Sequence, residues 1–139
     1  MKLKKSNSYA LHALMYMVRH ITQLPVPLRT ISKAERIPHG QLMKIFHRLT
    51  KAGFVKDMGR KGYAFERAPQ EIMLLDLFEL FEGNSIFGDC FMRHCDCGGT
   101  DQNCEIFAHW VQATRSLSAV LSKTSVQDAA WNHPEHYFG

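Results

Sequence analysis

Residues 40–65 read GQLMKIFHRLTKAGFVKDMGRKGYAF, and this stretch decides the fold. Its first half predicts an amphipathic helix, because apolar residues recur at spacings of three and four. The apolar positions are Leu42, Ile45, Phe46 and Leu49. Polar and cationic residues occupy the opposite face: Gln41, Lys44, Arg48 and Lys51. One face is therefore expected to pack against a core, while the other presents positive charge.

A shorter helix precedes this stretch. Leu28, Ile31 and Ala34 form its apolar side, and Pro38 ends it because a proline ring disfavours the helical conformation of the preceding residue. A tight turn follows the proline. A short helix, a turn and a second helix with a basic outer face predict a helix-turn-helix, whose second helix enters the major groove of DNA.

The second half of the stretch predicts a β-hairpin. Two β-prone runs, 54–58 and 63–65, flank the turn Gly59-Arg60-Lys61-Gly62. A hairpin directly after a basic helix is typical of a wing. Arg60 and Lys61 at its tip are expected to contact phosphates or to enter a narrow minor groove, with a solvated turn as the plain alternative.

Apolar periodicity outside this stretch predicts three more helices. One buried helix covers residues 6–21, and another covers residues 70–82 and closes the core. A last helix, about twenty residues long, begins near Cys104 and has the alternating four and three spacing of a helix that pairs with another helix. The residues at that spacing are Ile106, Trp110, Ala113, Leu117 and Val120. They predict a dimer interface, with packing against the first domain as the alternative.

The charge differs in sign between two parts of the chain. Residues 1–67 hold 14 of the 17 Lys and Arg and 3 of the 13 acids, whereas residues 68–139 hold 3 basic and 10 acidic residues. This division predicts a nucleic-acid-binding module with a separate sensing or pairing module. The expected fold is mainly α with a small β-hairpin wing. We divide it into a winged helix-turn-helix DNA-binding domain (1–83), a cysteine-rich cluster-binding loop (84–104), and a dimerisation helix and tail (105–139).

All four cysteines of the chain lie within CFMRHCDCGGTDQNC, residues 90–104. Such crowding in a polar, Gly-containing segment predicts a site rather than part of a core. The spacing C-x4-C-x-C-x6-C lacks the C-x2-C pairs that are typical of zinc sites. A thiol–disulfide switch needs only two of the thiols, whereas an iron–sulfur cluster uses three or four. The cluster accounts for most of the cysteines, and zinc and the disulfide switch stay open as alternatives.

The sequence indicates a cytoplasmic protein. No apolar run approaches the length of a membrane span. Polar residues interrupt the N-terminal apolar stretch at Ser6, Asn7, His12 and Arg19, unlike the apolar core of a signal peptide. In the cytoplasm, thiols stay reduced and clustered cysteines more often bind metal than form structural disulfides.

Together these blocks resemble the Rrf-type winged-helix regulators, a family that includes NsrR-like and IscR-like iron–sulfur sensors. The resemblance covers most of the chain and rests on MKLKKSNSYALHALMYM (1–17), QLMKIFHRLTKAGFV (41–55), GRKGYAF (59–65) and the cysteine loop. It implies a homodimer that binds a palindromic duplex and carries a 2Fe–2S or 4Fe–4S cluster, which protein prepared in air can lose. It also implies thiolate ligation by Cys90, Cys95 and Cys104. Cys97 is an alternative or fourth ligand, and His94 and His109 are further candidates for the fourth position.

We therefore interpret the chain as a DNA-binding transcriptional regulator, a repressor that senses nitric oxide, redox state or iron–sulfur status, and not as an enzyme. A first rival has the same fold with a disulfide or zinc switch, and it would be colourless. A second rival is a small iron–sulfur electron carrier or assembly protein. That protein would need neither the basic half nor the wing, and it should not bind duplex DNA.

Overall fold

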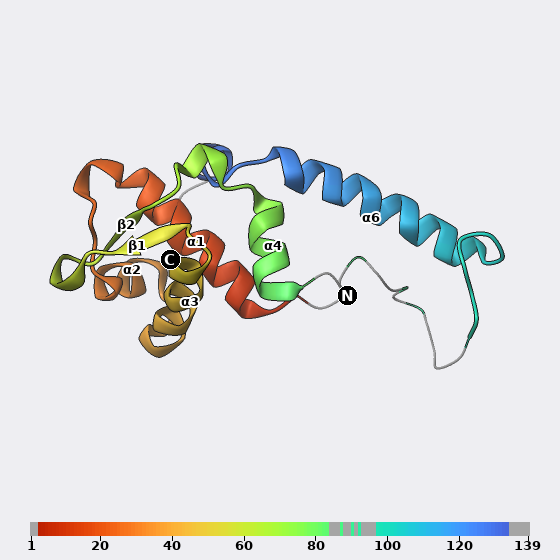
Figure 1. The fold of residues 1–139 in the computed structure, drawn as a ribbon, viewed down its shortest axis with the longest axis horizontal. Helices are drawn as coiled ribbons and strands as arrows, with labels where there is room; N and C mark the ends of the chain where they lie inside the picture. The colour runs from red at the N-terminus through yellow and green to blue at the C-terminus, as the bar shows by residue number, and fades with distance from the viewer. Residues whose placement is uncertain (1–2, 84–86, 88–89, 91, 93–96, 134–139) are drawn as a thin grey trace.

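The winged helix-turn-helix predicted from the sequence is present in the structure (Figure 1). The computed structural model describes residues 3–83, 87, 90, 92 and 97–133. Its helices and strands are α1 (Lys5–Arg19), α2 (Leu28–Glu35), α3 (His39–Lys51), β1 (Val55–Asp57), β2 (Tyr63–Phe65), α4 (Leu74–Glu82), α6 (Glu105–Lys123) and α7 (Val126–Asn132), with short 3-10 turns at Ile21–Gln23, Gly59–Lys61 and Pro69–Glu71. The predicted fold class, mainly α with a small hairpin wing, is confirmed.

Helix α1 lies at the centre of the core and contacts α2, α3, α4 and α7. Small and apolar residues recur along it every three or four positions, which buries one side of the helix: Ala10, Ala13, Leu14, Met17 and Val18. The apolar face predicted for α3 joins the same core, since its four residues are at most 3 % exposed: Leu42, Ile45, Phe46 and Leu49. The amphipathic pattern of the second helix is therefore confirmed.

Local hydrogen bonds fix the turn between α2 and α3. Arg36 ends α2 in the left-handed conformation, with φ at 53°, and Ser32 Oγ donates to the carbonyl oxygen of Ile37 at 2.6 Å. Pro38 immediately precedes α3, where its missing N–H removes no helical hydrogen bond. The first of the two helices therefore ends before Pro38, as the sequence predicts.

Main-chain hydrogen bonds join the start of α4 to the start of α7. The backbone N–H of Leu74 donates to Thr124 O at 2.8 Å, and that of Val126 donates to Ile72 O at 2.8 Å. We call this pairing the α4–α7 clamp. It keeps residues 72 and 73 extended, so α4 begins at Leu74 and not at residue 70, where periodicity alone places it.

Helix α6 extends away from the winged helix, and its C-terminal end returns the chain to that domain (Figure 1). Cys104 directly precedes it, as predicted. The next helix, α7, has no counterpart in the sequence prediction. Ser125 caps it by accepting a hydrogen bond from Asp128 N at 3.0 Å, and Val126 and Ala130 are buried in the core. Within the described residues, no helix is both long enough and apolar enough to cross a membrane.

Candidate nucleic-acid interface and cysteine segment

The outer face of α3 is exposed and cationic. Lys44 and Lys51 lie on it, as helical spacing predicts, together with Met43 and His47. Met43 and Lys44 are adjacent, and His47 and Lys51 follow at spacings of three or four, so the four residues share one helix face that we call the α3 strip. Sequence reasoning missed Met43 and His47, although the same spacing that selected Lys44 places them beside it.

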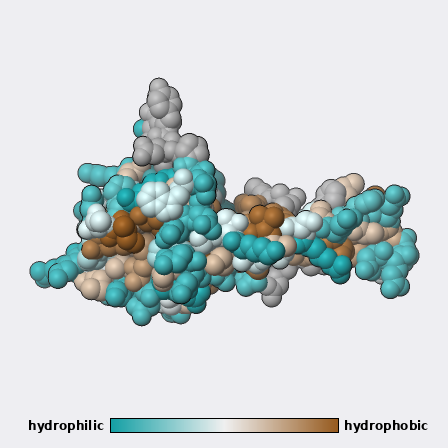
Figure 2. All heavy atoms as spheres, turned by 90° about the horizontal axis from the view of Figure 1, so that it is seen from above, coloured by the Kyte–Doolittle hydropathy of each residue, from teal (hydrophilic) through white to brown (hydrophobic). Residues whose placement is uncertain are grey.

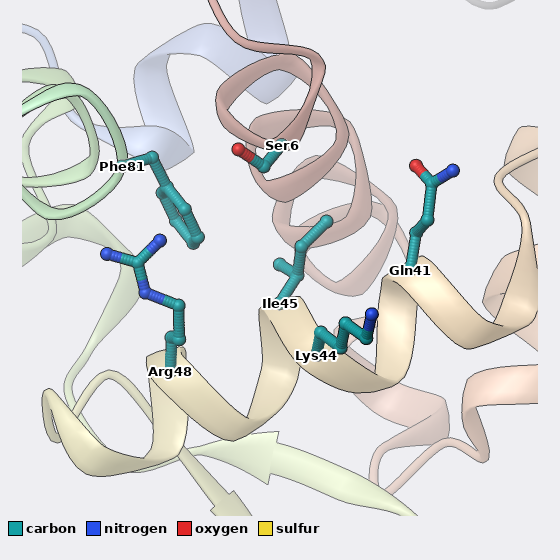
Figure 3. Close-up of a pocket in the computed structure, with 6 residues that line it drawn as sticks. All are labelled: Ser6, Gln41, Lys44, Ile45, Arg48 and Phe81. Atoms are coloured by element: carbon teal, nitrogen blue, oxygen red, sulfur yellow. The ribbon is translucent and has the colours of Figure 1, made fainter.

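Three residues assigned to the DNA surface, Gln41, Lys44 and Arg48, line a pocket of about 280 Å³ on the flank of α3 (Figure 3). Ser6 of α1 and Phe81 of α4 form the other side of this pocket. The Arg48 guanidinium lies 4.8 Å from the centroid of the Phe81 ring, and its Nη2 donates to the carbonyl oxygen of Leu80. Arg48 thus connects the recognition helix to α4, and its role in DNA binding stays a prediction.

The predicted wing is an antiparallel hairpin, in which Val55 pairs with Phe65 and Asp57 pairs with Tyr63. Hydrogen bonds close its tip, and Gly62 N donates to Gly59 O at 3.1 Å. Asp57 Oδ1 accepts from the backbone N–H of Gly59 at 2.9 Å, and Met58 N donates to Gly62 O at 2.7 Å. Because the tip is tightly turned, it presents two exposed cationic side chains, Arg60 and Lys61.

The base of the wing packs closely against the chain before α2. Val26 N donates to Tyr63 O at 2.9 Å, and Tyr63 N donates to Val26 O at 2.8 Å. Gly62 lies beside this pair, and a Cβ built on it would stand 2.1 Å from Val26 O. Only glycine permits this approach, which fixes the wing relative to the helix-turn-helix.

A groove of about 570 Å³ separates α3 from the wing, lined by Leu28, Met43, Lys44, His47, Arg48 and Tyr63. The Tyr63 ring is held in place edge-to-face against Phe46, with ring centroids 5.0 Å apart. Burial, and to a lesser extent the nearby Asp57 carboxylate, raises the pKa of the Tyr63 phenol. The phenol therefore keeps its proton at neutral pH and remains able to donate a hydrogen bond.

The structure describes three of the predicted cysteines, and Cys95 and the candidate His94 lie outside the described residues. Cys90 and Cys104 are half-buried, and Cys97 is exposed. The candidate His109 lies on the exposed side of α6, with its Nε2 3.5 Å from Glu105 Oε1.

Cys97 and Cys104 face the same glycine. A Cβ placed on Gly99 would lie 3.3 Å from Cys104 Cβ, 3.6 Å from Cys104 Sγ and 3.8 Å from Cys97 Sγ, so both cysteine side chains pack against this glycine. Cys90 Sγ accepts a hydrogen bond from Met92 N at 3.4 Å. Among the described residues, no group of three or more His, Cys, Asp and Glu side chains gathers as a metal site. The ligand roles of the four cysteines thus stay a prediction.

Helix α6 packs against α4 but leaves much of its predicted pairing face uncovered. Ile106 is 50 % exposed and Val120 60 % exposed, and Ala113 is exposed as well, whereas Trp110 and Leu117 are half-buried. Figure 2 shows hydrophobic side chains along this projecting part of the molecule, between hydrophilic ones. In the part of the chain that the structure describes, Ile106, Ala113 and Val120 of this face therefore stay exposed.

The chain is similar to known regulators in sequence. The Rrf2 family, described as "Iron-dependent Transcriptional regulator", matches residues 3–132. The HTH-type transcriptional regulator IscR of Photorhabdus laumondii is 27 % identical over 134 residues, which cover 95 % of this chain and 80 % of that protein.

Solved structures share the fold. CymR, the global cysteine regulator of B. subtilis, matches with a TM-score of 0.78 at 19 % identity, and the match covers 96 % of this chain and 99 % of CymR. IscR of T. potens matches with a TM-score of 0.74 at 22 % identity and covers 100 % of this chain and 94 % of that one. At such identities the likeness shows a common fold.

Proposed function

Because the chain belongs to the Rrf2 family of winged-helix transcriptional regulators, we propose that it is a homodimeric repressor that senses nitric oxide, redox state or iron–sulfur status through a cluster. The protein is a DNA-binding transcriptional regulator and not an enzyme. A transcriptional regulator acts in the compartment that contains the DNA, so we propose that the protein is cytoplasmic.

The observation that carries the DNA-binding mode is the exposed α3 strip beside the wing. In this proposal α3 enters the major groove with Gln41, Lys44, Arg48 and Lys51, and the wing tip reaches phosphate or the minor groove with Arg60 and Lys61. The groove between α3 and the wing supports this arrangement, because cationic side chains line a space next to an exposed helix face.

Salt dependence tests the wing. Arg60→Ala should weaken binding and flatten the slope of log K against log salt by about one unit, because one phosphate contact is lost. Lys123→Ala, an exposed position in the last turn of α6 and outside the proposed interface, is the control and should leave the slope unchanged. Equal slopes for wild type and Arg60→Ala would remove Arg60 from the interface.

We propose thiolate ligation of a cluster by the cysteines, and two contacts of the described ones support it. The sulfur atoms of Cys97 and Cys104 lie near the same residue, Gly99, and the N–H of Met92 donates to the sulfur of Cys90, as backbone donors do around iron–sulfur sites. We propose Cys90, Cys95 and Cys104 as ligands, with Cys97 as the alternative or fourth. When bound, a 2Fe–2S or 4Fe–4S cluster supplies a centre that reacts with oxidants and nitric oxide. The chain's own part is to hold it directly before α6.

A thiol–disulfide switch is the second candidate, favoured by the approach of Cys97 and Cys104 to one glycine. The visible absorption spectrum of protein purified without oxygen, with iron and sulfide assays, separates the two. A brown protein with near-equal iron and sulfide supports the cluster. A colourless protein with neither element, even after reconstitution, favours the disulfide or a zinc site.

We propose that two copies pair through one face of α6, formed by Ile106, Trp110, Ala113, Leu117 and Val120. Pairing would cover the exposed apolar side chains and hold two α3 helices for the half-sites of a palindrome, which lie about 34 to 36 Å apart. Sedimentation tests this. Val120→Glu should yield monomers, whereas Ala119→Glu, an exposed position away from that face, should stay dimeric.

A further inference from the structure

One side chain of the α3 strip is apolar. Met43 is 53 % exposed, although the other apolar residues of α3 are buried in the core. It lies in the groove between α3 and the wing, beside Lys44 and His47 and across from Tyr63. An exposed hydrophobic side chain alone means little, but this one lines the same groove as the cationic side chains of Lys44 and Arg48.

The side chains beside Met43 indicate which kind of ligand this groove binds. Lys44 is the next residue to Met43, and His47 lies one turn further on. Arg48 lines the groove as well. A polyanion that binds these side chains would also contact Met43. An apolar peptide or a lipid tail would instead lie beside cationic side chains that it cannot pair with. Charge complementarity therefore points to duplex DNA, in the orientation of the proposed function, on which this inference rests.

The chemical groups exposed in the major groove indicate which base Met43 contacts. Each base edge there presents hydrogen-bonding groups, but thymine alone adds a methyl group, at C5. An apolar side chain gains by contact with that methyl, whereas it would leave the polar edges of the other bases unsatisfied. We propose that Met43 determines part of the operator sequence by packing its side chain against a thymine C5-methyl in each half-site.

Deoxyuridine scanning measures this contact, because it removes only the methyl group. Duplexes selected from a random pool by the wild-type protein are remade with one thymine at a time replaced by deoxyuridine. Dissociation constants are then measured at one salt concentration. For the wild-type protein, replacing one particular thymine in one half-site should weaken binding about fourfold. Replacing the corresponding thymine in both half-sites should weaken binding about fifteenfold.

Three variants make the scan specific. Met43→Ala should bind the thymine and deoxyuridine duplexes equally well at that position, and Met43→Leu should keep most of the discrimination. Lys44→Ala is the matched control on the same face. It should weaken binding to all sequences and lower the salt slope, while the methyl effect remains.

The possible outcomes distinguish failure of this inference from failure of the proposed function. A deoxyuridine effect that is equally large in Met43→Ala, or absent from every thymine in wild type, overturns the assignment of Met43 and leaves DNA binding intact. Failure of the wild type, with and without its cluster, to enrich any duplex overturns the proposed mode of DNA binding and this inference together.

Discussion

Replacing Gly62 with alanine should destabilise the protein far more than replacing Gly59. Both glycines have positive φ, 103° and 69°, so both substitutions strain the backbone. They differ in the space around them. A Cβ on Gly62 would stand 2.1 Å from Val26 O and 2.4 Å from Pro27 N, whereas a Cβ on Gly59 meets nothing within 4 Å.

The overlap at Gly62 involves backbone atoms, so no side-chain rotation relieves it. The wing must move away from residues 26–27, which breaks the two main-chain hydrogen bonds between Val26 and Tyr63. Losing both costs about 2 kcal/mol, and the strained backbone conformation costs about 2 kcal/mol more. We expect Gly62→Ala to lower the free energy of unfolding by about 4 kcal/mol and Gly59→Ala by about 1 kcal/mol.

Urea unfolding followed by circular dichroism measures the difference. All proteins are compared at one protomer concentration, because the stability of a dimer depends on concentration. With an m-value of about 1.5 kcal/mol/M, the midpoint should fall by about 2.5 M for Gly62→Ala and by about 0.7 M for Gly59→Ala. Equal midpoints for the two variants would refute the close packing of the wing against residues 26–27.

Three further predictions concern single side chains. Arg48→Gln should lower the free energy of unfolding by about 1 kcal/mol in the same urea assay, because it removes the contact with the Phe81 ring and the bond to α4. Ser125→Ala should cost about 1 kcal/mol in thermal unfolding, because α7 loses its N-cap. Stability should fall as pH rises above 10 through the raised pKa of Tyr63, since the unfolded state releases that proton more readily. Tyr63→Phe should remove this part of the pH dependence, and an unchanged pH profile would contradict it.

The helices and the wing could be predicted because amphipathic period and turn composition are local properties of the sequence. The start of α4 and the existence of α7 could not be predicted from such local patterns. Residues 72 and 73 are helical by pattern but pair with the chain before α7, and α7 is short enough to depend on burial against α1. Both outcomes depend on contacts between segments far apart in the chain.

The same limit applies to the DNA surface. Periodicity groups Arg48 with Lys44, but it does not show that Phe81 lies within reach of the guanidinium. Met43 reads as a core residue by type, but helical spacing places it on the face of Lys44 and His47, and it is exposed there. The sequence therefore predicts where the α3 strip lies and that it is cationic, but it does not predict all of the residues that form the strip.

The cysteine segment and the recognition helix are connected through α4. Phe87, three residues before Cys90, stacks on Phe78 of α4 with ring centroids 6.3 Å apart, and the next turn of α4 holds Arg48 of α3. The clamp fixes the C-terminal end of α6 to the winged helix, while Cys104 lies at the other end of that helix. Helix α4 therefore contacts both the segment just before Cys90, through Phe78, and the recognition helix, through Leu80 and Phe81.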